Sequence, residues 1–137
     1  MDVLDVPDRA ASRRVGAASY AVLYEIARAV LDGGAGLVLE SNFRRVASLP
    51  ELHALSERAD AVLVQCHASR DILLQRYVAR APSRHRGHHD AHVELAADLD
   101  ADEFEPPDLG IPVLRVDTSD DYQPPLADIL AFVLASP

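Results

Sequence analysis

The stretch AVLVQCHASRDILLQRYVAR, residues 61–80, contains the strand-to-helix transition that decides the fold. Its first seven residues form an apolar, β-rich run that is typical of a buried strand. Ser69 then supplies an N-cap, with Asp71 in the first turn, and a helix follows until Pro82 ends it. A strand that leads directly into a helix is the first half of a strand–helix–strand unit, because parallel strands need a crossover connection.

Two more apolar runs predict strands on either side of this stretch. Residues 35–40 (AGLVLE) precede it and residues 111–117 (IPVLRVD) follow it, the latter after a turn that contains Gly110. Three strands separated by helices predict an α/β fold with a parallel sheet. The chain shows neither a linker nor an internal repeat, so residues 1–137 are expected to form a single domain.

The remaining segments predict helices. The first begins near Val15 and stops at Gly33-Gly34, where glycine suits the left-handed C-terminal position. A second is expected over residues 48–58, opened by a capping box of Ser48 and Glu51 with Pro50 in the first turn. The last spans residues 125–134. The apolar positions that recur at helical spacing in the first helix are Ala18, Val22, Leu23, Ile26, Val30 and Leu31.

Composition limits the function. The chain has a net charge of -9, with 22 acidic residues and 13 basic ones, and every basic residue is Arg. Such a charge disfavours binding to nucleic acid or to anionic membranes. No apolar run approaches the roughly 18 residues of a membrane span, and the N-terminus lacks a secretory signal. Because Cys66 is alone, no internal disulfide framework exists, and we expect a cytoplasmic protein.

Basic residues gather in one part of the acidic chain, at Arg70, Arg76, Arg80, Arg84 and Arg86. Arg76 and Arg80 are four residues apart and share a helix face, where two like charges cost roughly 0.2–0.5 kcal/mol. A bound phosphate would offset that cost by accepting hydrogen bonds from the guanidinium groups. The alternative is a solvated face whose cations pair with Asp and Glu side chains or with the helix C-terminus.

Several motifs occur in a meaningful order: LVLESNF (37–43), VLVQCHASRDILLQRYVAR (62–80), RHRGHHD (84–90) and VLRVDTS (113–119). Together they resemble the small-molecule kinases of the P-loop class, in particular the AAA-family kinases related to zeta toxins and chloramphenicol phosphotransferases. The similarity runs from about residue 4 to residue 119. It implies a three-layer P-loop NTPase-like parallel sheet with helices on both faces, ATP and Mg²⁺ as cofactors, and phosphoryl transfer to a small molecule.

The chain lacks the central element of this family, its phosphate-binding loop. The chain has no G-x-x-x-x-G-K-[ST] loop and no lysine, so the first strand and the phosphate loop of the family are missing. We therefore expect weak ATP binding and no catalysis. Two hypotheses remain: a small-molecule phosphotransferase that has a misassigned start or survives as a degenerate fragment, and a non-catalytic ligand-binding or interaction domain that retains the kinase-like fold.

The resemblance also assigns site residues. It implies a catalytic lid that contacts the ATP phosphates and the transferred group, formed by Arg76, Arg80, Arg84 and Arg86. Asp117 and Thr118 would flank the nucleotide, beside Arg76 and Arg80. The residues expected to bind the substrate are Arg13, Arg14, Glu40, Asn42, Phe43, His85 and His88.

Four histidines in the lid segment suggest an alternative role for it, the binding of a metal ion. His85 with His89, and His88 with His92, have the i, i+4 spacing that lets two imidazoles bind one metal on a helix. Neither an H-E-x-x-H motif nor a cysteine partner accompanies them, and Gly87 interrupts the segment. We therefore assign no metal site and favour a place in the lid for His85 and His88.

The missing strand has a structural consequence. In the resembled fold it lies between the strands at residues 37–40 and 61–66. Either these two strands pair directly in a three-stranded sheet, or a second copy of the chain covers the gap and forms a homodimer. In both cases marginal stability is expected, since a core built for about five strands closes over three.

Overall fold

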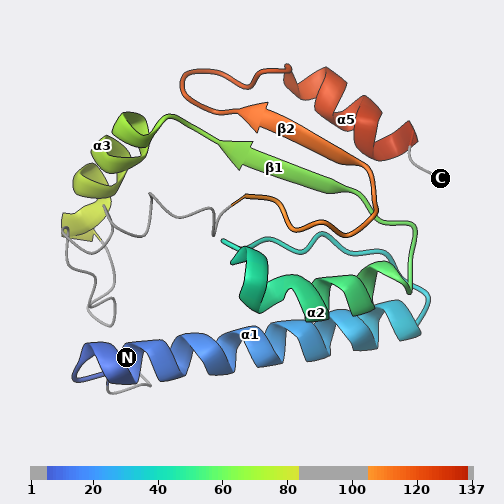
Figure 1. Ribbon diagram of the computed structural model, residues 1–137, viewed down its shortest axis with the longest axis horizontal. Helices are drawn as coiled ribbons and strands as arrows, with labels where there is room; N and C mark the ends of the chain where they lie inside the picture. The colour runs from blue at the N-terminus through green and yellow to red at the C-terminus, as the bar shows by residue number, and fades with distance from the viewer. Residues whose placement is uncertain (1–5, 84–104, 136–137) are drawn as a thin grey trace.

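The computed structural model describes residues 6–83 and 105–135, and within them the chain is a mixed helix and strand structure (Figure 1). Its arrangement is compatible with the α/β class. The elements in chain order are α1 (Arg9–Asp32), α2 (Arg45–Ser56), β1 (Leu63–His67), α3 (Arg70–Arg80), a 3₁₀ turn (Ala81–Ser83), β2 (Val113–Asp117) and α5 (Leu126–Ala135).

The two strands form a parallel sheet. Leu63 lies opposite Val113, and the register continues to His67 opposite Asp117. The ladder extends beyond the strands at both ends, where the Leu63 N–H donates to the Pro112 carbonyl (3.0 Å) and the Thr118 N–H to the His67 carbonyl (2.8 Å). The crossover between the strands contains α3, whose N-cap is Ser69 (Oγ to the Ile72 nitrogen, 3.4 Å). The predicted strand–helix–strand unit is confirmed.

The strand predicted at residues 35–40 is wrong. This stretch has no strand assignment, and the Val38 side chain is 95% exposed. A strand is stabilised by hydrogen bonds to a neighbouring strand, and among the described residues β1 pairs with β2 alone. The three-stranded sheet expected from direct pairing of residues 37–40 with 61–66 is therefore absent from the described part of the chain, whose sheet has two strands.

Helix α1 starts earlier than predicted. Asp8 is its N-cap, and the Asp8 Oδ1 accepts a hydrogen bond from the Ala11 N–H at 2.7 Å. The predicted stop is confirmed: the Gly33 N–H donates to the Ala29 carbonyl (3.1 Å), and Gly34 adopts a φ of 75° that favours glycine. Arg13 and Arg14 consequently lie inside the helix and not before it.

The capping box predicted for α2 is wrong. The helix begins at Arg45, and Ser48 lies in its first turn with only 4% of its surface exposed. The Ser48 N–H donates to the Arg44 carbonyl at 2.8 Å, so this serine is a helical residue and not a cap. Glu51 does not cap the helix either, because its carboxylate forms an ion pair with Arg28 of α1. That ion pair links the two helices.

The main core lies between α1 and α2. Its buried members are Tyr24 and Ala27 from α1 with Leu52 and Leu55 from α2. The half-buried side chains that pack against them are Tyr20, Leu31, Leu39, Phe43 and Leu109.

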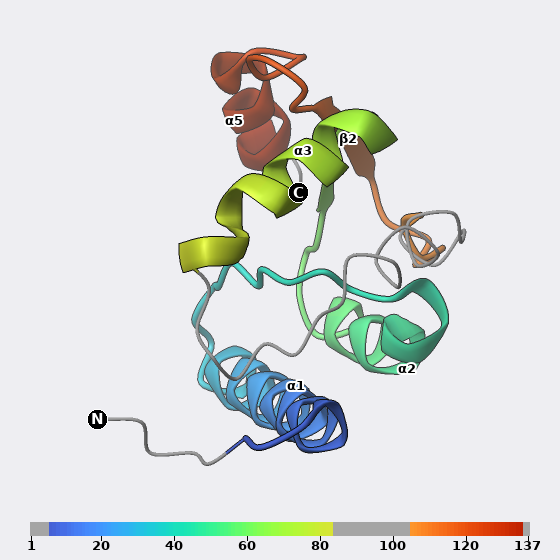
Figure 2. The ribbon, with the colours of Figure 1, turned by 90° about the vertical axis from the view of Figure 1, so that its left-hand side faces the viewer.

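The elements follow one another across the molecule. In Figure 1, α2 lies between α1 and the strands, and α5 runs alongside β2 at the opposite edge; Figure 2 gives the same order after a 90° turn. Val116 of β2, 1% exposed, belongs to a separate buried region in the sheet. No helix within the described residues is both long and apolar enough to cross a membrane.

The core face of α1 differs from the apolar pattern that predicted the helix. Val22 and Ile26, which belong to that pattern, are each 58% exposed. The residues that α1 contributes to the core, Tyr24 and Ala27, lie on the other side of the helix. The periodicity predicted a helix correctly, but the helix carries two apolar faces and α2 covers the one that contains the tyrosines.

We expect Leu52→Ala to lower the free energy of unfolding by about 2–5 kcal/mol, because it leaves a cavity between α1 and α2. Val46→Ala is the matched control on the same helix, since Val46 is 81% exposed and its loss should change stability by less than about 0.5 kcal/mol. Urea denaturation of both variants measures the difference. Equal effects would contradict the placement of the core.

Candidate functional site

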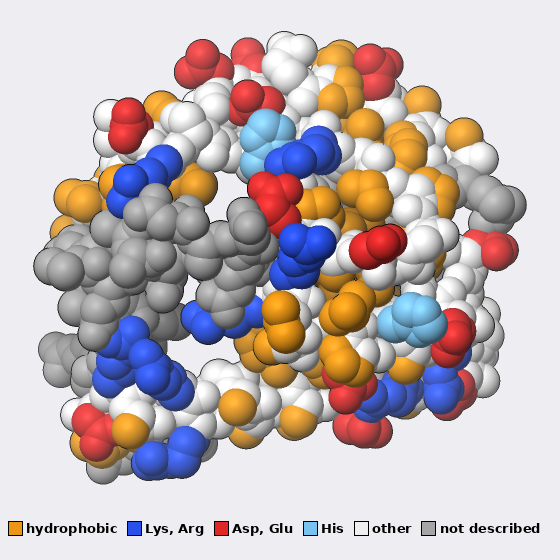
Figure 3. Space-filling view, in the orientation of Figure 1, with side chains coloured by type: hydrophobic (Ala, Val, Ile, Leu, Met, Phe, Trp, Pro, Cys, Tyr) orange, Lys and Arg blue, Asp and Glu red, His pale blue; other side chains and the backbone are white. Residues whose placement is uncertain are grey.

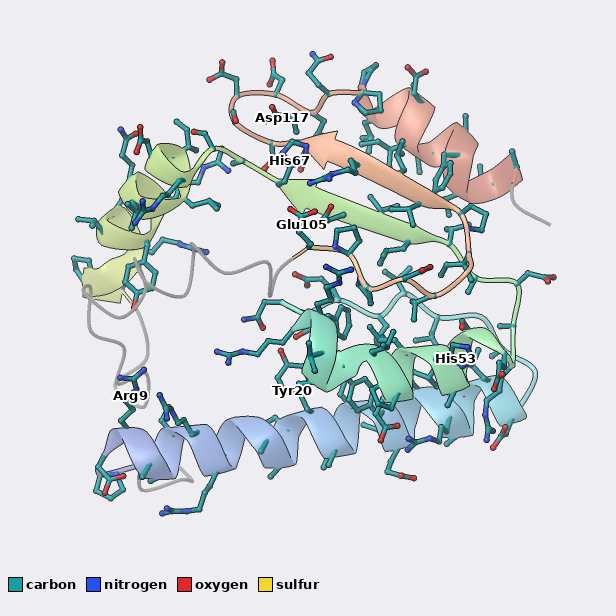
Figure 4. The ribbon with its side chains drawn as sticks, in the orientation of Figure 1. Arg9, Tyr20, His53, His67, Glu105 and Asp117 are labelled. Atoms are coloured by element: carbon teal, nitrogen blue, oxygen red, sulfur yellow. The ribbon has the colours of Figure 1, made fainter. Side chains whose placement is uncertain are left out.

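Polar side chains gather where the two parallel strands end. We define the carboxyl-edge cluster as His67, Arg76, Asp117, Thr118 and Ser119. Because β1 and β2 run parallel, their carboxyl ends lie at the same edge, and Figure 4 shows His67 and Asp117 close together there. This edge is where open α/β sheets bind ligands, so it is the first place to test for a site.

Arg76 reaches this edge from α3. Its Nη2 donates to the carbonyl oxygens of Thr118 and Ser119 (2.9 Å to Ser119), and its Nη1 lies 3.4 Å from the Thr118 Oγ1. The guanidinium therefore binds backbone of this chain at the position where the kinase resemblance implies phosphate. The effect is to fasten α3 to the segment that follows β2.

Thr118 is held from the other side by β1. Its hydroxyl donates to the His67 carbonyl at 2.9 Å, and its N–H donates to the same oxygen at 2.8 Å. The segment is closed further along by two hydrogen bonds between the backbones of Asp117 and Gln123, at 2.8 and 2.9 Å. Residues 117–123 are thus tied to both β1 and α3.

The Asp117 carboxylate completes the turn. Its Oδ1 accepts a hydrogen bond from the Ser119 N–H at 2.8 Å. The Ser119 side chain and then this N–H lower the pKa of Asp117 below its ordinary value and outweigh the opposing effect of desolvation, and electrostatic interactions with His67 and Arg76 act in the lowering direction. The carboxylate consequently stays ionised at neutral pH and stabilises the turn.

Among the predicted substrate-binding residues at 40–43, Asn42 and Phe43 make contacts within the protein that stabilise the fold. The Tyr20 hydroxyl donates to the Asn42 Oδ1 at 2.7 Å, and the Ser41 hydroxyl donates to the Tyr20 oxygen at 2.9 Å. Phe43 packs against the core between α1 and α2, while Glu40 is exposed. These contacts anchor the loop after α1 and leave the Asn42 side chain already engaged.

Tyr20 is the polar residue that the sequence analysis missed. Its signal was its spacing from Tyr24, four residues later, which places both rings on one face of α1 with centroids 6.1 Å apart. The predicted apolar pattern shared Leu31 with the core face but passed over both tyrosines.

The other predicted residues are scattered. Arg80 lies exposed in the last turn of α3, and Arg13 and Arg14 are exposed on α1. Within the described residues, neither Arg13 nor Arg14 has a hydrogen bond or ion pair to the carboxyl-edge cluster. The remaining predicted lid and histidine positions, Arg84, His85, Arg86, His88, His89 and His92, lie outside the described residues.

Neither a metal site nor a uniformly basic surface is evident. In residues 6–83 and 105–135 no group of three or more His, Cys, Asp or Glu is placed to hold a metal ion. On the face in Figure 3, basic and acidic side chains lie next to one another, and Arg115 pairs with Glu105 at 3.2 Å. Within these two ranges, charged side chains of both signs are therefore mixed, and none form such a cluster.

Comparison with known proteins gives no independent support for any family. No family model matches the sequence, and searches of curated proteins and of solved structures each found no match. The resemblance to P-loop kinases therefore rests on the quoted motifs alone, and the functional argument rests on the contacts described above.

We expect Arg76→Gln to speed amide hydrogen exchange at Thr118 and to lower stability by roughly 0.5–1.5 kcal/mol, because two carbonyl oxygens lose a donor. Arg80→Gln removes a cation one turn further along α3 and is the matched control. Native-state hydrogen exchange followed by NMR measures both. Unchanged exchange at Thr118 in Arg76→Gln would show that the guanidinium does not hold this segment.

The Asp117 carboxyl should titrate below the usual value of about 3.9 for aspartate. Ser119→Ala should raise its pKa, because the first cause of the lowering is lost, whereas Ser41→Ala should not. Since the folded-state pKa is lowered, Asp117 stabilises the fold above the unfolded-state pKa, and this contribution disappears as the pH falls through the folded-state pKa. Carboxyl ¹³C NMR between about pH 2 and 6 measures the titration.

Proposed function

We propose that this chain is a non-catalytic interaction domain with a P-loop kinase-like α/β core, and that it does not transfer phosphoryl groups. The residues that resemble a kinase site stabilise the fold. This is the second of the two hypotheses that the sequence left open.

One observation carries the proposal: the candidate residues nearest the sheet edge and the core, Arg76 and Asn42 among them, are occupied by contacts within the protein. Arg76 donates to the carbonyls of Thr118 and Ser119, and Asn42 accepts from Tyr20. A phosphate that approached Arg76 would have to displace hydrogen bonds that hold the segment after β2. Binding would then cost part of the stability of that segment, which argues against Arg76 as a preorganised phosphate ligand.

The chemistry that phosphoryl transfer requires supports the same conclusion. The reaction depends on positioning and on positive charge around the phosphates, supplied in P-loop enzymes by a lysine, backbone N–H groups and Mg²⁺. The sequence contains no lysine, and the described residues present no ligand set for a metal ion. These observations disfavour tight ATP–Mg²⁺ binding by this chain.

A weak phosphate-binding site is the second candidate. It is favoured by the amino end of α3, which follows His67 at the carboxyl end of β1, whereas the ionised Asp117 opposes anion binding and keeps it weak. There the ligand would be a small phosphate compound held without Mg²⁺. Such a site could coexist with a non-catalytic role.

Calorimetric titration of the 137-residue chain with ATP, with and without Mg²⁺, separates these functions. We expect a Kd no tighter than about 100 µM, no dependence on Mg²⁺, and no phosphoryl transfer above a buffer control. Low-micromolar, Mg²⁺-dependent affinity or measurable transfer would overturn the proposal.

Chemical-shift mapping with ATP tests the second candidate. Shifts confined to residues 67–70 and 117–119, lost in His67→Ala and kept in Arg58→Gln, would support a weak phosphate site. Arg58 is the control because it pairs with Asp32, at 2.5 Å, beside the carboxyl end of α1. If ATP causes no chemical-shift changes, the weak phosphate site is rejected and the interaction role remains as the proposed function.

A further inference from the structure

Helix α1 carries a second apolar stripe that no described element covers. Its members are Val15, Ala18, Val22, Ile26 and Ala29, at intervals of three, four, four and three residues. Val22 lies two residues from Tyr24 and so about 200° around the helix from the core face. In Figures 1 and 2, α1 is the outermost helix, with α2 on its inner side.

The exposure of these residues agrees with their position. Val22 and Ile26 are each 58% exposed, Ala18 and Ala29 are exposed, and Val15 is half-buried. The stripe extends along roughly 21 Å of helix and contains no charged side chain. An uncharged aliphatic stripe of this length is expected to pack against another apolar surface.

The stripe is complementary to itself. Its spacing is symmetric about Val22, so an antiparallel copy that crosses there places Val22 against Val22. Ile26 then faces Ala18 of the partner, and Ala29 faces Val15 of the partner. On either side of the central Val22 pair, a larger side chain meets an alanine, which favours close packing between two helices.

The charges beside the stripe are compatible with the same pairing. Glu25 and Arg14 lie on one flank of α1, at about 100° and 80° from Tyr24. An antiparallel pair related by a twofold axis brings this flank of one copy beside the same flank of the other. Glu25 of one copy would then lie about 7.5 Å along the axis from Arg14 of the other and about 9 Å from the other Glu25. Within each copy the charge of Glu25 is already balanced by Arg28, at 2.6 Å.

We propose that two copies of this chain associate through an antiparallel α1–α1 contact centred on Val22. The contact is at α1 and is distinct from the gap in the sheet where the sequence suggested a homodimer. It is also independent of nucleotide binding. One helix pair buries less than the roughly 1,600 Å² of a standard interface, so the dimer should be reversible, with a micromolar Kd.

Analytical ultracentrifugation over about 1 µM to 1 mM tests the association. We expect the mass to rise with concentration from 14.9 kDa toward about twice that value. Val22→Glu places two carboxylates at the centre of the contact and should raise the Kd at least about tenfold. Val46→Glu, at a position 81% exposed on α2, is the matched control and should leave the Kd unchanged.

Disulfide formation tests the register, in a Cys66→Ser background that removes the exposed native thiol. Val22→Cys should cross-link to itself on oxidation. Ala18→Cys and Ile26→Cys should cross-link to each other when mixed, and far less when each is alone, because a disulfide needs Cα atoms within about 7 Å.

The outcomes are decisive in both directions. A monomer at every concentration, or a dimer that survives Val22→Glu with its circular dichroism unchanged, would overturn the proposal. The latter result would place the contact at the sheet edge or at α5. If Val22→Glu fails to fold, the cross-linking pattern decides alone: a loss of the Ala18–Ile26 preference would reject the proposed register.

Discussion

Parallel pairing of β1 and β2 is the constraint on which the rest of the described structure depends. Two parallel strands need a connection that crosses from the end of one to the start of the other, and α3 lies in that connection. The same geometry brings His67 and Asp117 to one edge, within reach of the Arg76 side chain of α3. The position of Arg76 beside the segment after β2 follows from this pairing.

At the carboxyl edge of the sheet, the side chains of Arg76 and Asp117 form hydrogen bonds that stabilise the fold and are therefore not free to bind a ligand. A guanidinium group can hold a phosphate or a pair of carbonyl oxygens, but the same donors cannot do both. Arg76 holds the carbonyls of Thr118 and Ser119, and Asp117 is satisfied by Ser119 within its own turn. A polar cluster at a ligand-binding edge can therefore be structural in origin, and its residue types alone do not establish a reaction.

Helix α1 supplies the surface for the proposed interaction role. One face contributes Tyr24 and Ala27 to the core, and the opposite face presents Val22 and Ile26 to the outside. A helix that is apolar on two sides gains the full hydrophobic free energy available to it when both sides are covered. Since α2 covers one side, a second copy is a natural partner for the other, and the symmetric spacing about Val22 gives it a defined register.

The sequence by itself determined the elements whose signals are local. Gly33 and Gly34 stop α1, Ser69 caps α3, and the apolar runs at residues 61–67 and 111–117 contain β1 and β2. Backbone conformation and capping depend on neighbouring residues, so these elements could be predicted without a structure. The strand–helix–strand unit follows from them because parallel strands require a crossover.

Only the tertiary structure decided which of these signals are used. Residues 35–40 have the composition of a strand but lack a partner, and a strand depends on hydrogen bonds to another segment. Ser48 and Glu51 have capping spacing, yet burial and the pairing with Arg28 give them other roles. The choice between the two apolar faces of α1, and between phosphate and backbone for Arg76, likewise depends on contacts between residues distant in sequence, which local patterns do not encode.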